Sequence, residues 1–301
     1  MRCASNQEQC VSGFPARLPD NRGDVRDGLE PYGYRDMRTT QRNAVTLTGN
    51  DLGQPMVFAH GYGCDQNMWR LVAPAFADTY RLVLFDHVGN GKSDLSAYDD
   101  QRHSTLDGYA DDILEILHEN DLWDVVFVGH SVSAMMGVIA AIKEPERFAK
   151  LVLIGPSPRY INEPGDDYVG GFNHSDIDSL LESLDSNYLG WSSQMAPVIM
   201  GNPERPELGD ELTNSFCRTD PEIAKKFARV AFLSDNRDDL LKLRTPSLIL
   251  QCTDDVIAPT FVGDYVHKHT AGSTMVYMNA TGHCPNLSAP EETIDAIKSW
   301  L

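Results

Sequence analysis

Short apolar runs separated by helical periods are the feature that most restricts how this chain can fold. The runs are rich in Val, Ile, Leu, Met and Phe, and they are Met56–Ala59, Leu82–Phe85, Val125–Val128, Leu151–Ile154, Leu248–Gln251 and Met275–Met278. Continuous apolar runs are typical of strands that are covered on both faces. Between two of them, apolar residues recur every three or four positions over 106–117, with Ser104 as the expected N-cap. This alternation predicts an α/β fold built on a mostly parallel, doubly wound sheet.

Residues 158–243 break the alternation, because they contain helical periods and no clear strand. We expect helices over Asp176–Leu189, Trp191–Met200, Glu207–Phe216 and Pro221–Phe232, and a final helix of the chain over Pro290–Leu301. Helices inserted between two strands of a parallel sheet are expected to cap the sheet edge where ligands bind in open α/β folds. The predicted organisation is a core of residues 41–157 and 244–301 with a helical cap of residues 158–243.

Residues 1–40 have a different composition from the rest of the chain. They contain six Arg and six acidic residues and show no hydrophobic period, so we expect a flexible extension. No secretory signal or membrane-spanning helix is expected, because no sufficiently long apolar stretch occurs. The six cysteines are scattered without a CxxC pair, a pattern typical of reduced thiols in a cytoplasmic protein.

The charge balance restricts the kinds of partner. The 44 acidic residues outnumber the 25 Lys and Arg, which gives a formal net charge of −19 over 301 residues. A chain this acidic is a poor candidate for binding nucleic acid or an anionic membrane surface through bulk electrostatics. We therefore expect neither partner.

A serine stands where an apolar run ends and a helix is expected to begin. The residues Gly129-His130-Ser131-Val132-Ser133 follow the G-x-S-x-G pattern of a nucleophile elbow, except that the last position is Ser133. The elbow needs small residues because the turn is tight and the next helix packs close to it, and Ser is small enough to fit. The run before Ser131 and the helical period after it make this serine the candidate nucleophile.

A serine hydroxyl needs a base to accept its proton, and the base needs an acid to orient it. In the order Ser, Asp, His, the base comes late in the chain. His283 follows the last apolar run, in a loop that is expected to return over the sheet edge. Asp254 and Asp255 both follow the run at Leu248–Gln251, and spacing alone leaves either of them as the acid.

The reaction also needs backbone N–H donors for the negative oxygen of its intermediate. One donor is expected from Val132, directly after the nucleophile. The other is expected from Tyr62, in the glycine-containing loop that follows the first apolar run. This chemistry requires no cofactor.

Four other histidines have more ordinary interpretations. His60 and His130 stand at strand ends, where we expect structural hydrogen bonds and no catalytic role. His267 and His269 are separated by one residue, so on a helix they point apart. They are expected to be a surface pair, and no metal site is expected.

Two further patterns are rejected as functional motifs. Gly89–Ser93 resembles the end of a phosphate-binding loop, but that motif needs Gly where this chain has Asp86. Cys64 and Cys284 stand close to the expected site in sequence, but neither lies between a strand and a helix. A thiol nucleophile is therefore disfavoured.

Longer stretches of the chain resemble the α/β-hydrolase superfamily, and within it the group of RsbQ-like bacterial hydrolases and plant strigolactone and karrikin receptors. The resemblance spans almost all of residues 42–301. The stretches that carry it are HGYGCDQNMW, FDHVGNGKSD, TLDGYADDI, FVGHSVSAMMG, GPSPRYIN, SFCRTDPEIAKKFARVAFLSDNRDDL, LILQCTDDVIAP and GHCPNLSAPEET. The GHSVS elbow is that of the plant receptors, whereas the stretches from the cap are closer to the bacterial type.

The resemblance implies a site and a role. It implies a triad of Ser131, Asp255 and His283, because the family's acid stands four residues before a proline, as Asp255 does before Pro259. It also implies a cap of four helices in two V-shaped pairs over a hydrophobic pocket. Positions matching that pocket include Tyr62, Trp191 and Phe172, and we add Met195 from the cap as a candidate lining residue.

Two functions follow from these expectations. The first is a serine hydrolase that slowly cleaves a small hydrophobic ester, lactone or butenolide-like ligand. The second is a receptor that uses the triad for recognition or for a single turnover and signals through a protein partner. By resemblance, that partner is a sensor phosphatase in bacteria or an F-box protein in plants. A third hypothesis is an acyltransferase that uses the triad, which requires an acceptor of the acyl group that excludes water from the site.

Overall fold

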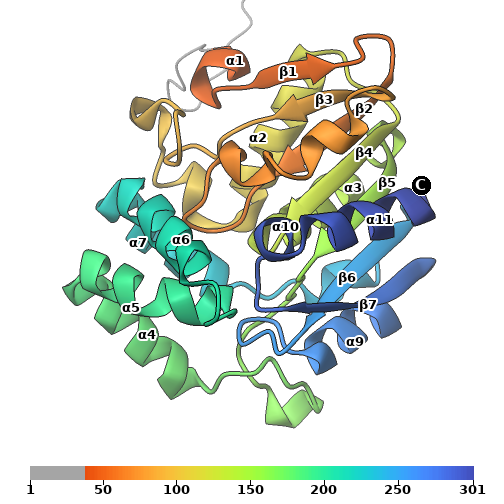
Figure 1. Ribbon diagram of the computed structural model, residues 1–301. Helices are drawn as coiled ribbons and strands as arrows, with labels where there is room; N and C mark the ends of the chain where they lie inside the picture. The colour runs from red at the N-terminus through yellow and green to blue at the C-terminus, as the bar shows by residue number, and fades with distance from the viewer. Residues whose placement is uncertain (1–37) are drawn as a thin grey trace, which may run out of the picture. The chain divides into compact units, whose positions relative to one another are not determined.

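The computed structural model describes residues 38–301, which form a seven-stranded sheet in the order β1-β3-β2-β4-β5-β6-β7 (Figure 1). The strands are β1 Thr46–Gly49, β2 Gln54–Ala59, β3 Tyr80–Leu84, β4 Val125–His130, β5 Phe148–Ile154, β6 Ser247–Thr253 and β7 Ser273–Thr281. Strand β1 pairs antiparallel with β3, and every other pair is parallel. The expected α/β fold with a mostly parallel sheet is therefore observed.

The apolar runs lie inside strands β2 to β7, with one difference at a boundary. Phe85 was expected to end a strand, but β3 ends at Leu84. Strand β1 has no apolar run in the sequence, because all four of its residues are exposed at the edge of the sheet. The continuous runs reflect burial on both faces, which is complete along β4.

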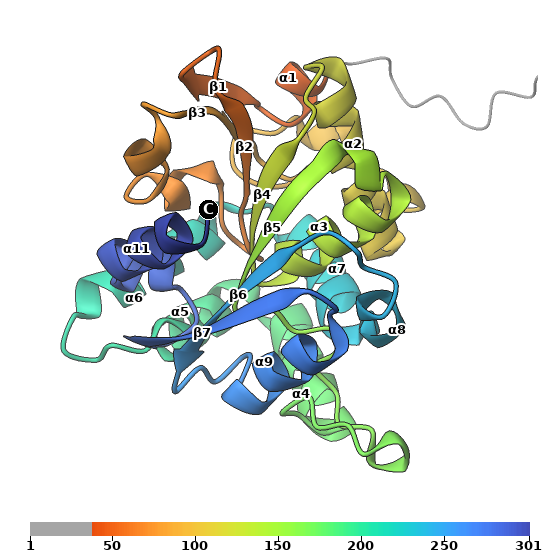
Figure 2. The same cartoon turned by 90° about the vertical axis from the view of Figure 1, so that its right-hand side faces the viewer.

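Each face of the sheet carries its own hydrophobic core. In β2, Met56 and Phe58 pack on one face, whereas Val57 and Ala59 pack on the other. Figure 2 shows α11 on the first side and α2 and α3 on the second. The longer helices of these layers are α2 Leu106–Glu119, α3 Val132–Lys143, α9 Thr260–His269 and α11 Pro290–Trp300. The sheet is thus doubly wound, as expected.

Four long helices stand between β5 and β6, and Figure 1 shows them together beside one end of the sheet. They are α4 His174–Ser186, α5 Tyr188–Met200, α6 Pro206–Arg218 and α7 Pro221–Leu233. The expected helix over Asp176–Leu189 ends earlier, because Asn187 caps α5 by accepting a hydrogen bond from the N–H of Gly190. Each of the other three expected helices lies within the helix observed there.

Shorter elements connect these layers. They are α1 Thr39–Arg42, α8 Arg237–Leu240 and α10 Pro285–Ser288, with 3₁₀ turns η1 Gln66–Trp69, η2 Ala73–Phe76, η3 Leu95–Ala97, η4 Arg102–Ser104, η5 Pro145–Arg147 and η6 Pro164–Asp166. The prediction of Ser104 as the N-cap of α2 was wrong. Thr105 occupies the N-cap of α2, and the Ser104 hydroxyl instead donates to the carbonyl of Gln101, the residue before η4.

The extension expected over residues 1–40 lies outside the described residues, except for its last three. Of these, Thr39 and Thr40 belong to α1. The Thr39 N–H donates to a carboxylate oxygen of Glu119, and the buried Arg42 side chain pairs with Glu115. These contacts attach α1 to α2.

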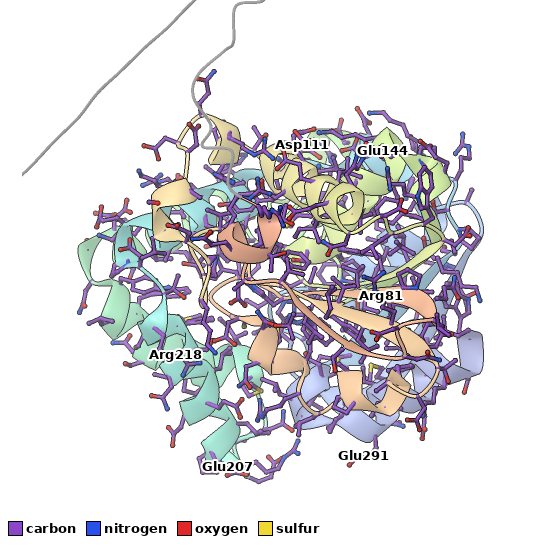
Figure 3. The ribbon with its side chains drawn as sticks, turned by 90° about the horizontal axis from the view of Figure 1, so that it is seen from above. Arg81, Asp111, Glu144, Glu207, Arg218 and Glu291 are labelled. Carbon is purple, nitrogen blue, oxygen red and sulfur yellow. The ribbon has the colours of Figure 1, made fainter. Side chains whose placement is uncertain are left out.

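Charged side chains project outward from the helices. Figure 3 labels examples on two of them, Glu207 and Arg218 on α6 and Glu291 on α11, and all three residues are exposed. Among residues 38–301, no helix is both long enough and apolar enough to span a membrane.

Candidate active site

Ser131 occupies the sharp turn between β4 and α3. Its backbone has φ 57° and ψ −125°, a conformation that residues other than glycine rarely adopt. The Ser131 N–H donates to the carbonyl of Ile154 on the neighbouring strand over 2.8 Å, which helps to hold the turn. A side chain at Gly129 would place its Cβ 2.6 Å from the carbonyl oxygen of Ser133. The geometry is that of a nucleophile elbow.

His283 contacts both of its expected partners. Its Nε2 atom lies 2.7 Å from Oγ of Ser131, and its Nδ1 atom lies 2.7 Å from Oδ2 of Asp255. All three residues are buried. An Nδ1–H donated to the carboxylate leaves Nε2 free to accept the serine proton, which is the arrangement that nucleophilic catalysis by serine requires.

Of the two neighbouring aspartates, Asp255 is the one that reaches His283. Burial raises the pKa of its carboxyl, but the charge and hydrogen bond of His283 outweigh burial, together with N–H donors from Ile257 and Ala258. The net effect lowers the pKa of Asp255, so the carboxylate is ionised at neutral pH. Asp254 is exposed and lies in the left-handed region with φ 51°.

The loop that carries His283 is held from two sides. His130 donates from Nε2 to the carbonyl of His283 over 2.7 Å. The His283 N–H donates to the carbonyl of Ile199, at the end of α5, over 2.9 Å. Burial lowers the pKa of His130 to about 3, so its ring stays neutral. His130 therefore has the structural hydrogen bond that its position in the sequence led us to expect.

The two expected oxyanion donors flank Ser131. Val132 is the first residue of α3, so its N–H has no acceptor within the helix. Tyr62 follows Gly61, where an added Cβ would lie 3.3 Å from Cβ of Ser131. Within residues 38–301, the N–H of Tyr62 has no hydrogen-bond acceptor. Tyr62 and Val132 thus each keep a backbone N–H without an acceptor among residues 38–301.

A cavity of about 40 Å³ opens beside Ser131 and His283. Its apolar lining comes largely from helices α5, α6 and α7 together with the three loops after β2, β5 and β6, and it includes Tyr62, Tyr160, Trp191, Ile199, Leu212, Phe216, Ala231, Phe232 and Ile257. Of the residues predicted to line a pocket, Tyr62 and Trp191 line this cavity. Phe172 and Met195 do not line it, and their side chains pack against the surrounding core.

Sequence reasoning missed several lining residues that pack tightly with those it found. The ring of Trp191 stacks on Phe216 with centroids 5.8 Å apart, and Tyr62 meets Phe216 edge-on at 5.7 Å. Leu212 and Phe216 are four residues apart on α6, so the helical period indicated that they share a face. It did not indicate what that face covers.

Comparison with known proteins identifies the family. Residues 56–296 match the alpha/beta hydrolase family. The chain belongs to this family. This confirms the fold class and the hydrolase class that the sequence predicted.

Individual relatives of this hydrolase include plant proteins. It is 39% identical to the karrikin insensitive 2 receptor CA of Petunia hybrida, over 81% of this chain and 90% of the relative. It is also 39% identical to the strigolactone esterase D14 of Arabidopsis thaliana, over 82% and 91% respectively. A solved structure of a hydrolase from Oleispira antarctica superimposes with a TM-score of 0.84 at 39% identity, covering 87% of this chain and 95% of that one.

The two thiols considered as alternative nucleophiles of this hydrolase are not activated. Cys64 and Cys284 line the cavity, but both thiols are buried. Burial raises the pKa of Cys64 to about 12 and raises that of Cys284 well above its ordinary value. The thiolate is the reactive form of cysteine, so neither residue is an activated nucleophile at neutral pH.

The other rejected motifs also have structural roles in the hydrolase. His267 contacts the Ser273 hydroxyl through Nδ1, whereas His269 contacts the carbonyl of Tyr265. No group of metal-ligating side chains occurs among residues 38–301. Where a phosphate-binding loop would need glycine, the Asp86 carboxylate accepts hydrogen bonds from the backbone N–H groups of Gln66 and Lys92.

Proposed function

We propose that this hydrolase cleaves a small hydrophobic ester or lactone, including butenolide-like ligands, through a Ser131–His283–Asp255 triad. The observation that carries the proposal is the position of His283, within 2.7 Å of both Ser131 and Asp255 at the wall of an apolar cavity. Residues 158–243 act as the cap of the core in this proposal, because α5, α6 and α7 supply much of the cavity lining.

The reaction follows from the geometry. Oγ of Ser131 attacks the carbonyl carbon while its proton passes to Nε2 of His283, and Asp255 stabilises the imidazolium that forms. The carbonyl oxygen becomes negative and accepts hydrogen bonds from the N–H groups of Tyr62 and Val132. Collapse of the intermediate breaks the ester bond and returns the proton to the leaving oxygen. Water then attacks the acyl group on Ser131 by the same route, with His283 as the base.

The cavity supports a small and largely apolar ligand. Its volume of about 40 Å³ holds no more than a few water molecules. A larger ligand has to displace side chains such as Trp191, Phe216 or Phe232, each of which is nearly fully buried. A need for such displacement favours slow turnover.

A second function is favoured by the relatives. One of them is named a receptor and another an esterase, at the same 39% identity. In this function a protein partner reads out the occupied or acylated state, and the triad turns over once or slowly. A sensor phosphatase and an F-box protein are the partner types we propose, and the cytoplasm is the proposed location.

Time-resolved intact-mass and product analysis separates the two functions. The probe is a fluorogenic ester that contains a butenolide, and wild type is compared with Ser131→Ala. Rapid multiple turnover that disappears in Ser131→Ala indicates a metabolic esterase. A slow burst near one equivalent, with an adduct on Ser131 or His283, indicates the receptor function. Inactivity of the wild type across a broad panel of esters would contradict the triad chemistry itself.

A further inference from the structure

Ser133, the residue that departs from the usual elbow pattern, reaches across to the oxyanion loop. Its side chain is fully buried. The Ser133 hydroxyl donates to the carbonyl oxygen of His60, which directly follows β2. The same hydroxyl oxygen lies 2.7 Å from Nε2 of His87, in the loop after β3. A residue two positions after the nucleophile is therefore bonded to the loops after two other strands.

The hydrogen bonds fix where the protons of this cluster lie. Burial lowers the pKa of both His60 and His87, so both rings are neutral. The His87 backbone N–H donates to Nε2 of His60 over 3.0 Å, which places the proton of His60 on Nδ1. Because the Ser133 proton is committed to the His60 carbonyl, Nε2 of His87 is the donor to Ser133. It also lies 3.1 Å from the His60 carbonyl oxygen.

These bonds constrain the two peptide units that precede Tyr62. The first unit is held at the carbonyl of His60 by Ser133 and His87. The second is held at the carbonyl of Gly61, which accepts from Nδ1 of His60 over 2.9 Å. That carbonyl belongs to the same planar peptide as the N–H of Tyr62, so fixing one end of the peptide aims the other.

We propose that Ser133 and His87 are positioning residues for the oxyanion hole. They hold the loop so that the Tyr62 N–H points at the place where the ligand's carbonyl oxygen becomes negative. Preorganised donors stabilise the negative oxygen of the transition state because they need no reorientation during the reaction. The proposal rests on the proposed function, and it gives the serine at the fifth elbow position a role that small size alone does not.

The test compares Ser133→Ala with wild type on 4-nitrophenyl acetate. We expect kcat to fall roughly 10- to 100-fold while KM changes little. A loosely held N–H donor stabilises the transition state less, whereas the binding of the neutral ester depends little on it. The affinity for a trifluoromethyl ketone, which forms a negatively charged adduct with serine, should fall by a similar factor. The pH profile should not move, because His283 and Asp255 are untouched.

Two further comparisons separate positioning from general stability. Ser133→Thr keeps the hydroxyl, whereas Ser133→Val has a similar shape without it, so Thr should be the more active of the pair. Ser247→Ala is the matched control, because Ser247 is fully buried and also donates to a backbone carbonyl, that of Thr245. An active wild type with an equally active Ser133→Ala would overturn this inference alone. A wild type that is inactive on every ester would overturn the proposed function, and this inference with it.

Discussion

The backbone N–H of His283 donates a hydrogen bond to the carbonyl oxygen of Ile199 over 2.9 Å. This bond joins the loop of the proposed catalytic base to the C-terminal end of α5. The side-chain amide of Asn202, two residues past that helix, adds a bond to the carbonyl of Thr281 over 3.1 Å. The position of His283 is therefore coupled to the segment that lines the cavity.

Substitution of Gly282 tests this coupling. Gly282 has φ +79°, and an added Cβ would lie 1.9 Å from the carbonyl oxygen of Met200 at the end of α5. In Gly282→Ala the loop has to move away from α5, and a displacement of about 1 Å at a catalytic group can lower turnover about 100-fold. We expect a loss of kcat of about that size on 4-nitrophenyl acetate, in a protein that remains folded by circular dichroism.

The control for this variant is Gly272→Ala. Gly272 has a similar φ of +74°, but an added Cβ would meet nothing within 4 Å. Gly272→Ala therefore introduces the same kind of backbone strain without the clash, and the kcat of this variant should stay close to that of wild type. Equal activity of the two variants would show that the contact with α5 does not position His283.

The two neighbouring aspartates should differ sharply on substitution. Asp255→Asn replaces the carboxylate that orients His283, and the analogous change in a serine-protease triad lowers kcat about 10⁴-fold. Asp254→Asn changes an exposed side chain at φ 51°, a conformation that asparagine tolerates. We expect Asp254→Asn to retain kcat within about twofold. A large loss in Asp254→Asn would contradict the geometry of the triad.

Strong local signals made much of the fold predictable, together with the serine and histidine of the proposed triad, whereas the choice of Asp255 over Asp254 came from the family resemblance. Doubly covered strands left continuous apolar runs, and Ser131 and His283 each followed one. Strand β1 left no such signal, since its four residues are exposed at the sheet edge. The pairing of β1 with β3 depends on contacts between separate segments, and no local sequence pattern predicts those contacts.

The details of the site depend on contacts between distant segments, and these were harder to predict. Phe172 and Met195 belong to the segment that contains the cavity-lining helices, but only the packing of those helices decides which side chains face the cavity. Ser133 was predicted to fit because it is small. Its hydroxyl has a partner 73 residues away, the carbonyl of His60, and nothing in the elbow pattern indicates that bond.

Acid should destabilise the protein through its buried neutral histidines. Burial lowers the pKa of His130 to about 3, whereas an unfolded histidine has a pKa of about 6.5. Between these values the unfolded chain binds a proton that the folded chain excludes. The stabilisation is therefore complete above about pH 6.5 and is lost as the pH falls, by up to about 1.4 kcal/mol per pH unit. His60 and His87, whose pKa values burial also lowers, add to the same trend.

Urea unfolding at pH 7, 6 and 5 measures this trend. The free energy of unfolding should decrease with acidification in wild type. His130→Gln should show a shallower dependence, by up to one proton, because glutamine does not titrate. His174→Gln, at an exposed position, is the control and should follow wild type. An identical slope in wild type and His130→Gln would contradict the assignment of a neutral, buried His130.

The size of the cavity should decide which esters the enzyme accepts. Trp191 stacks on Phe216 and meets Tyr62 edge-on with centroids 6.3 Å apart, so its ring is one wall of a space of about 40 Å³. Wild type should therefore prefer acetyl over hexanoyl esters of 4-nitrophenol. Trp191→Leu keeps the wall apolar but enlarges the space. The ratio of kcat/KM for the hexanoyl ester to kcat/KM for the acetyl ester should therefore rise by roughly tenfold or more, since each accommodated methylene contributes about 0.8 kcal/mol.

The control is Trp123→Leu, which replaces a half-exposed tryptophan outside the cavity and should leave the ratio unchanged. An unchanged ratio in Trp191→Leu would mean that the acyl group does not occupy this cavity.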